Sequence, residues 1–255
     1  IEAIRKVGAG HIGGSLSIVE LLAVLYGKQL NYDPKNPQWE ERDRVVLSKG
    51  HAGTAWYSAL AEVGFFEKNW LMTLNEGGTR LPSHPDRTKT PGVDATTGSL
   101  GQGISSAVGM ALAGKIDNKA YRVYTILGDG ELEEGQVWEA SMCAAHYKLD
   151  NLTAFIDFNG LQIDGNIEDV MNPSPIDKKF EAFGWNVLVI DGHNYDEIID
   201  AIEKAKACKD KPTAVICKTV KGKGVSFMEN EAAWHGTAPS KEQCEKALAE
   251  IGGDR

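Results

Sequence analysis

The sequence predicts an α/β protein built on a doubly wound parallel sheet with helices on both faces. Five short apolar runs rich in β-branched residues are expected to be strands, at 44–48, 122–127, 152–158, 186–190 and 213–220. Segments with helical periodicity separate these runs, and strands that alternate with helices form parallel sheets. The 255 residues could hold one large α/β domain or two small ones. The regular alternation favours one sheet.

The composition argues against several classes of protein. A net charge of −9 disfavours non-specific binding to nucleic acid or to an anionic membrane. No apolar run approaches the ~20 residues that span a bilayer, and the first residues lack a signal-peptide pattern, although the chain starts without Met. The four cysteines show neither CxxC nor zinc-ligand spacing, so we expect reduced thiols. A cytoplasmic protein without nucleic-acid or membrane partners is predicted.

The N-terminal segment contains a glycine pattern with two interpretations. Residues 1–7 end a helix, 8–14 form a loop, and Ser17 with Glu20 is a capping box that begins an apolar helix. The loop also spells GxGxxG, the dinucleotide fingerprint. That fingerprint needs a strand before it and another before its acidic residue. Residues 1–7 have helical character and 31–34 form a turn, so we disfavour dinucleotide binding.

The segments between the first two strands contain two candidate histidines. His51 follows strand 44–48 at the start of a helix over about 52–63, a natural place to meet phosphate, although a loop histidine can be structural. His84 lies between two prolines in an aperiodic stretch, 75–93, and loops this long are usually functional or disordered. The glycines of 96–103 permit close approach to a ligand, or to another helix, before a small-residue helix that ends near 116.

The central unit, 122–158, consists of a strand, a crossover helix and a second strand. The helix has one apolar face, formed by Trp138, Met142 and Ala145 with a neighbouring row of Val137, Ser141 and Ala144. A right-handed crossover makes the strands parallel, so both end at the edge of the sheet where α/β folds bind ligands.

Asp129 and Asn159 follow these two strands and are expected to be neighbours in space. With a main-chain carbonyl such as that of Leu161 they form a hard oxygen set, which suits Mg²⁺ or Ca²⁺. Gly130 lets the backbone approach an anion. The same Asp-Gly and Asn-Gly pairs are also simple turn formers. Glu131 and the nearby Glu133 are expected to be solvated loop charges.

The C-terminal third adds helices at 176–183 and 197–208, each followed by a strand. His193, after strand 186–190, is expected to be a structural loop histidine. Residues 221–224 follow the last strand and lack the Walker pattern, so we expect a flexible basic loop. His235 lies near the end of the chain, where surface exposure is the simplest interpretation.

Seven motifs, in order along the whole chain, resemble those of the transketolase family of thiamine diphosphate enzymes. They are GHIGGSLS (10–17), LSKGHA (47–52), SHPD (83–86), TTGSLGQG (96–103), GDGELEEG (128–135), NGLQIDG (159–165) and WHG (234–236).

The resemblance implies a thiamine diphosphate-binding fold and a divalent cation, Mg²⁺ or Ca²⁺, that holds the diphosphate. It also implies roles for individual residues. The catalytic residues are His11, His84 and His235; the cofactor-binding residues are His51, Gly98, Leu100, Gly130, Asn159 and His235; and the metal ligands are Asp129, Asn159 and Leu161. Glu134 and Glu139 match acidic positions at the family's dimer interface.

The implied reaction is the reversible transfer of a two-carbon ketol unit from a ketose donor to an aldose acceptor, as in the pentose phosphate pathway. Imidazoles with pKa values near neutrality suit its proton transfers. Within this resemblance, residues 1–255 are a single diphosphate-binding domain, and the pyrimidine-binding and C-terminal domains are absent. The chain is then a fragment or the N-terminal subunit of a split transketolase. The tail ends as a charged helix followed by Gly-Gly, which favours a subunit that acts with a C-terminal partner on sugar or sugar-phosphate substrates in an α2β2 heterotetramer.

Two other functions stay open. One is a related thiamine diphosphate subunit, similar to 1-deoxyxylulose-5-phosphate synthase or to the E1 component of a 2-oxo acid dehydrogenase. The motifs TTGSLGQG and LSKGHA favour a ketose over pyruvate. The other is a non-catalytic cofactor-binding or regulatory subunit. The presence of all four candidate site histidines argues against it.

Overall fold

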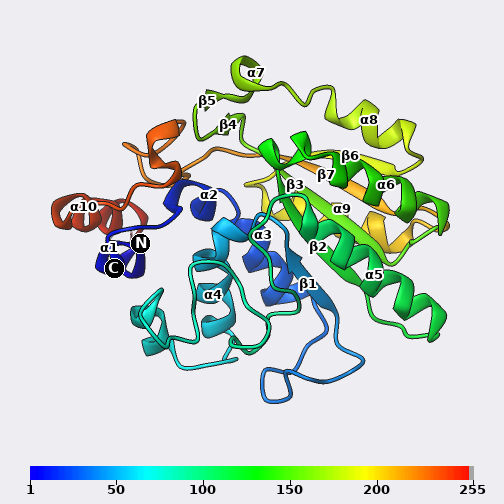
Figure 1. Cartoon of the computed structure of the whole chain (residues 1–255), viewed down its shortest axis with the longest axis horizontal. Helices are drawn as coiled ribbons and strands as arrows, with labels where there is room; N and C mark the ends of the chain where they lie inside the picture. The colour runs from blue at the N-terminus through cyan, green and yellow to red at the C-terminus, as the bar shows by residue number, and fades with distance from the viewer. Residues whose placement is uncertain (253–255) are drawn as a thin grey trace.

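Five parallel strands form the central sheet of the protein (Figure 1), which we describe from a computed structural model for residues 1–252. The strands, in their order across the sheet, are β1 (Arg44–Leu47), β2 (Val123–Gly128), β3 (Leu152–Phe158), β7 (Thr213–Lys218) and β6 (Asn186–Asp191). All four neighbouring pairs are parallel. The five expected strands are therefore confirmed, and so is the doubly wound α/β class.

Two separate groups of helices cover the two faces of the sheet (Figure 1). Helices α5 (Gln102–Ile116), α6 (Gly135–His146) and α8 (Ile176–Ala182) share one apolar core with Val123 and Leu127 of β2. Helices α3 (Val19–Val24), α4 (Gly53–Glu62) and α9 (Tyr195–Ala207) share the other core with Tyr124 and Ile126. Side chains of a strand point alternately to opposite faces. Both faces of β2 are therefore buried, as its apolar sequence predicts.

Short elements complete the described chain. They are α1 (Glu2–Val7), α2 (Ile12–Leu16), η1 (Leu25–Gln29), η2 (Gly50–Ala52), η3 (Lys68–Thr73), η4 (Gly130–Glu133), the hairpin β4 (Leu161–Gln162) and β5 (Gly165–Asn166), α7 (Ile167–Val170), η5 (Ala232–His235) and α10 (Lys241–Gly252). Residues 253–255, which include the second glycine of the expected helix stop, lie outside the described residues. No helix within 1–252 combines the length and the apolar character needed to cross a membrane.

Two details of the sequence prediction are wrong near the N-terminus. Part of the expected loop is helical, as α2, and the Ser17 side chain makes no capping hydrogen bond to the start of α3. Its hydroxyl instead donates hydrogen bonds to the Asp157 carboxylate at 2.7 Å and to the Gly14 carbonyl at 3.1 Å. The local capping pattern is overridden by a long-range partner.

The buried face of α6 also differs from the expectation. Met142 is 58% exposed. Burial instead follows the neighbouring row, which contains Val137, Ser141 and Ala144. Trp138 closes the side of the helix by stacking on Phe183, with ring centroids 5.8 Å apart. Helix α6 packs against α5, and its buried side chains share one core with α5 and the sheet.

Candidate active site

A cavity of about 220 Å³ lies at the carboxyl edge of the sheet. All but one of the predicted site residues line it: His11, His51, Gly98, Leu100, Asp129, Gly130, Asn159, Leu161 and His235. The remaining one is His84, whose ring centroid lies 5.9 Å from that of His11. A cavity of about 500 Å³ elsewhere, between α1, α3 and α4, is lined mainly by apolar side chains. The smaller cavity is the candidate active site, because the polar and ionisable side chains line it.

Four histidines from distant segments meet at the rim of this cavity. The ring centroid of His11 lies 5.2 Å from that of His51 and 5.4 Å from that of His235. The rings of His51 and His235 are stacked, 5.2 Å apart. Gly98 makes room for His84: its φ is +145°, and a Cβ there would lie 3.0 Å from the His84 ring. We define His11, His51, His84 and His235 as the histidine rim.

Burial keeps three rings of the histidine rim neutral. It lowers the pKa of His11, lowers that of His51 well below its usual value, and lowers that of His235 to about 4. Positive neighbours act in the same direction, chiefly Lys49 on His51 and Lys221 on His235. A neutral imidazole offers one N–H donor and one acceptor nitrogen. A pKa of about 4 lies below the near-neutral value that suits proton transfer, so at neutral pH the His235 ring acts as a hydrogen-bond donor and acceptor.

Lys221 contacts both the rim and the predicted metal ligands. Its Nζ lies 2.9 Å from His235 Nδ1 and donates to the Leu161 carbonyl at 3.2 Å. Because an ammonium only donates, His235 Nδ1 is the acceptor and Nε2 holds the proton. The Lys221 side chain is 2% exposed, and burial lowers its pKa to about 8.

The prediction that residues 221–224 form a flexible basic loop is therefore wrong. Gly222 N donates to the Gly13 carbonyl at 3.0 Å and fixes the loop against the N-terminal segment. The position of the loop at a strand's carboxyl end, the same signal used for Asp129, could have identified Lys221.

The structure brings the two central turns together as predicted. Gly128 pairs with Asp157 across β2 and β3, so Asp129 and Asn159 leave the sheet side by side. The Asp129 carboxylate accepts from Gly130 N at 2.9 Å and from Gly160 N at 2.6 Å. It is 3% exposed, and burial, followed by repulsion from Asp157, raises its pKa to about 7.

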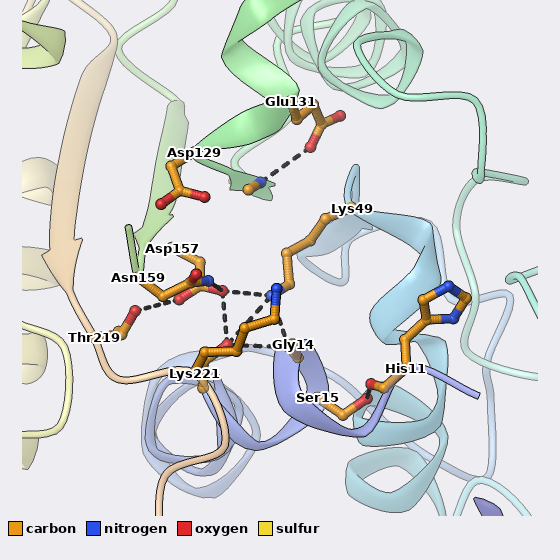
Figure 2. A network of polar contacts seen from close by, with 12 residues as sticks. His11, Gly14, Ser15, Lys49, Asp129, Glu131, Asp157, Asn159, Thr219 and Lys221 are labelled. Atoms are coloured by element: carbon orange, nitrogen blue, oxygen red, sulfur yellow. Dashed lines mark hydrogen bonds and ion pairs between the residues drawn. The ribbon is translucent and has the colours of Figure 1, made fainter. Parts of the chain in front are cut away.

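A buried ion pair, which was not predicted from the sequence, forms the floor of the cavity. Lys49 Nζ lies 2.5 Å from Asp157 Oδ2 and also donates to the Gly14 carbonyl at 2.7 Å (Figure 2). Burial raises the pKa of Asp157, but the charge of Lys49 together with the hydrogen bonds from Lys49, Thr219 and Ser17 outweighs burial, and the net pKa is lowered. A carboxylate inside the otherwise apolar strand 152–158 was the available signal, because buried charges are paired.

Glu131 also belongs to the floor, so its assignment as a solvated charge is wrong. It is 2% exposed and accepts hydrogen bonds from the Ser48 hydroxyl, from Gly101 N at 2.9 Å and from Gly128 N at 3.1 Å. These contacts tie the ends of β1 and β2 to the glycine-rich loop. Glu133 is exposed as expected. We define Lys49, Asp129, Glu131 and Asp157 as the charged floor.

Comparison with known proteins identifies the family in which this arrangement of residues occurs. The family described as "Transketolase, thiamine diphosphate binding domain" matches residues 1–254. The chain is 53% identical to a 6-deoxy-6-sulfo-D-fructose transketolase subunit from Clostridium sp. (strain MSTE9), over 98% of this chain and 91% of that protein. It is 43% identical to one of the subunits of an apulose-4-phosphate transketolase from Actinobacillus succinogenes, over 95% of this chain and 87% of that protein.

Larger transketolases contain the same unit. The crystal structure of transketolase from Campylobacter jejuni superimposes with a TM-score of 0.93 at 36% identity, over 99% of this chain and 40% of that one. Human transketolase is 41% identical over 98% of this chain and 40% of its own length. This chain belongs to the transketolase family and corresponds to its thiamine diphosphate binding domain.

Proposed function

We propose that this chain is the N-terminal subunit of a split transketolase, which transfers a two-carbon ketol unit together with a C-terminal partner subunit. The observation that carries the proposal is the similarity to two relatives that are themselves named as subunits, at 53% and 43% identity. The chain spans 91% and 87% of two relatives that are named as transketolase subunits, but 40% of the human enzyme. The pyrimidine-binding and C-terminal domains would then lie on the partner, in an α2β2 assembly, and residues 1–255 form the diphosphate-binding domain.

A divalent cation fits the oxygen set at the edge of the sheet. Asp129, the amide oxygen of Asn159 and the Leu161 carbonyl all border the cavity and are hard ligands that suit Mg²⁺ or Ca²⁺. Residues 1–252 contain no group of three His, Cys, Asp or Glu side chains arranged for a metal ion. A carboxylate as buried as Asp129, with its pKa raised to about 7, gains from a neighbouring cation. The donor set therefore supports the cation.

The remaining roles follow from the chain's own residues. Thiamine diphosphate supplies the carbanion chemistry when it is bound. His51, Gly98, Leu100 and Gly130 line the cavity beside the metal ligands and would contact the cofactor. Neutral imidazoles of His11, His84 and His235 would hold and move protons at the substrate hydroxyls. His235 can donate from Nε2 because Lys221 occupies Nδ1.

We further propose a ketose donor with an anionic terminal group. Two relatives are named for 6-deoxy-6-sulfo-D-fructose and for apulose 4-phosphate, a sulfonate and a phosphate. Lys49 and Lys221 of this chain are already hydrogen-bonded at the cavity. The group that recognises the anion would then lie on the partner subunit. A place in the cytoplasm and in pentose phosphate interconversion belongs to the same proposal.

The interface is proposed at the N-terminus of α6. Glu134 and Glu139 are exposed there, at one end of the cavity loops. Gly101, whose φ is +80°, packs its backbone against Glu134, where a Cβ would lie 2.7 Å away. Both carboxylates are therefore available to a second subunit beside the cofactor site.

Co-purification and assay test the proposal. The chain is expressed with a C-terminal transketolase subunit, and ketol transfer is measured with thiamine diphosphate and Mg²⁺ for fructose 6-phosphate, sulfofructose and pyruvate as donors. We expect turnover of a ketose only when both chains are present. Full turnover by this chain alone would contradict the split enzyme, and a preference for pyruvate would favour the synthase-like or dehydrogenase-like alternative.

A further inference from the structure

The side-chain amide of Asn159 is held in one orientation by two partners. Its Nδ2 donates to Asp157 Oδ2 at 3.0 Å, and its Oδ1 accepts from Leu161 N at 3.1 Å. A carboxylate can only accept hydrogen bonds, so the amide nitrogen must face Asp157 and the amide oxygen must point away from it. An amide oxygen has two lone pairs, so Oδ1 keeps one acceptor position beyond its bond to Leu161.

Asp157 is itself fixed from several directions. Besides Asn159, its carboxylate receives hydrogen bonds from Lys49 and from the Thr219 hydroxyl (Figure 2). The Ser17 hydroxyl donates a further one. These donors come from the ends of β1, α2 and β7, so the carboxylate cannot rotate without breaking contacts to other elements. Lys49 provides the opposite charge that a fully buried carboxylate requires.

A neutral residue at position 157 would remove this restraint. An amide has nearly the same shape when its oxygen and nitrogen are exchanged, so hydrogen bonds alone decide its orientation. If Lys49 were removed as well, so that position 157 could present a donor to Asn159, the Asn159 amide could turn its NH₂ group toward the cavity by giving up the hydrogen bond from Leu161 N. That group carries positive hydrogens and cannot ligate a cation.

We propose that Asp157 is a positioning residue for the cation site, which keeps the oxygen of Asn159 available to the metal, and that Lys49 makes this buried carboxylate possible. The inference rests on the proposed function, in which Asn159 is a ligand. It assigns the Lys49–Asp157 pair a role in metal affinity that is separate from holding the fold together.

The first test is Asp157→Asn, in the full chain with its partner subunit. Binding of Mg²⁺, and of Mn²⁺ as a paramagnetic substitute, is measured in the presence of thiamine diphosphate by calorimetry and electron paramagnetic resonance. Loss of a residue that orients a metal ligand typically costs about 10- to 100-fold in metal affinity, and we expect a loss in that range. The matched control is Thr219→Val, which removes a hydrogen bond from the other oxygen of Asp157 but leaves Asn159 untouched. Its metal affinity should stay at the wild-type value.

A second variant separates orientation from charge and from folding. Asp157→Asn combined with Lys49→Met removes both charges, so no uncompensated buried ion is left to unfold the protein. We expect the full loss of metal affinity here and at most the same loss in Asp157→Asn alone, because Lys49 no longer holds an oxygen of residue 157 toward Asn159. Thermal melting of each variant shows that it is folded.

The third variant exchanges the two side chains, as Asp157→Asn with Asn159→Asp. A carboxylate at position 159 presents an oxygen in either orientation, so metal affinity should recover by about tenfold over Asp157→Asn alone. Unchanged affinity in the folded double variant Asp157→Asn with Lys49→Met, or no recovery in the folded exchange variant, would overturn the inference. If the wild-type assembly bound neither the cation nor thiamine diphosphate, the proposed function would fail first, and this inference with it.

Discussion

The charged floor and the histidine rim lie within one cavity but are built in opposite ways. Floor side chains come from the ends of β1, β2 and β3 or from η4, and each has fixed hydrogen-bond partners. Rim rings come from loops and short helices. Within residues 1–252 the rings of His11, His51 and His84 make contacts with other rings but no side-chain hydrogen bond.

This difference separates two tasks. A charged group that binds a cation or a diphosphate works best when its position is preorganised, because nothing then has to be reorganised on binding. A group that moves protons needs an accessible nitrogen and a pKa that leaves it neutral. The floor is therefore expected to control binding, and the rim to control turnover through His11 and His84, while His51 and His235 would also contact the cofactor. Substitutions in each region test this division.

The largest effect is expected at the centre of the rim. His11→Asn keeps a polar side chain but removes the imidazole, and loss of a general acid–base group lowers kcat by about 10²- to 10⁴-fold. The affinity for thiamine diphosphate should be unchanged, because the floor is intact. Steady-state kinetics of the assembled enzyme, with cofactor titration, separate the two quantities. His146→Asn, an exposed site on α6, is the control. A weakened cofactor affinity in His11→Asn would erase the distinction between rim and floor.

The floor should show the reverse pattern. Asp129→Asn keeps the shape of the side chain but replaces one carboxylate oxygen with an NH₂ group, so we expect cation affinity to fall by about 100-fold or more. The apparent affinity for thiamine diphosphate should fall with it. Saturating Mg²⁺ should then restore much of kcat, since the rim is unchanged. Titration of kcat against Mg²⁺ tests this, and a kcat that stays low at saturation would contradict the division.

A stability effect is expected where the floor connects three loops. Gly101 N and Gly128 N donate to different oxygens of Glu131, so the NH₂ group of Glu131→Gln faces one of these N–H donors and leaves it unpaired. Such a change costs about 1–3 kcal/mol of unfolding free energy. The neighbouring Glu133→Gln is exposed and should change it by less than ~0.5 kcal/mol. Urea denaturation of both variants measures the difference. Equal losses of unfolding free energy would show that the buried hydrogen bonds of Glu131 do not stabilise the fold.

The sequence predicted the parts of the site that follow local rules. Asp129 and Asn159 were found because parallel strands end at one edge, and the histidines because their motifs resemble those of a family. The Lys49–Asp157 ion pair was not predicted because its two residues lie 108 positions apart in the sequence. The burial of Glu131 was not predicted for the same reason, since its partner Ser48 lies 83 positions away. Judged from its sequence neighbours alone, an acidic cluster indicates solvent-exposed charges.

Local rules failed wherever a distant contact was stronger. Ser17 satisfies the capping-box pattern, yet its hydroxyl bonds Asp157, 140 positions away. The hairpin β4–β5 has strands of two residues, too short for any periodicity to indicate. The strands themselves were predictable to within two residues, because burial on both faces produces continuous apolar runs.

The smallest effect is a pH dependence of stability that arises in the rim. The pKa of His235 is lowered from 6.5 to about 4 in the folded protein, so below pH 6.5 the unfolded chain binds a proton that the folded chain does not. The stabilising contribution is complete above pH 6.5 and is lost progressively as the pH falls toward 4. His235→Asn lacks this titration but keeps an acceptor for Lys221. Its melting temperature relative to wild type should therefore rise between pH 7.5 and pH 5, whereas that of the exposed His146→Asn should not.

Comparing each variant with wild type at the same pH cancels the opposite effect of Asp129, whose raised pKa favours the folded state in acid. A constant difference for His235→Asn would show that the rim is solvated and not held neutral by burial.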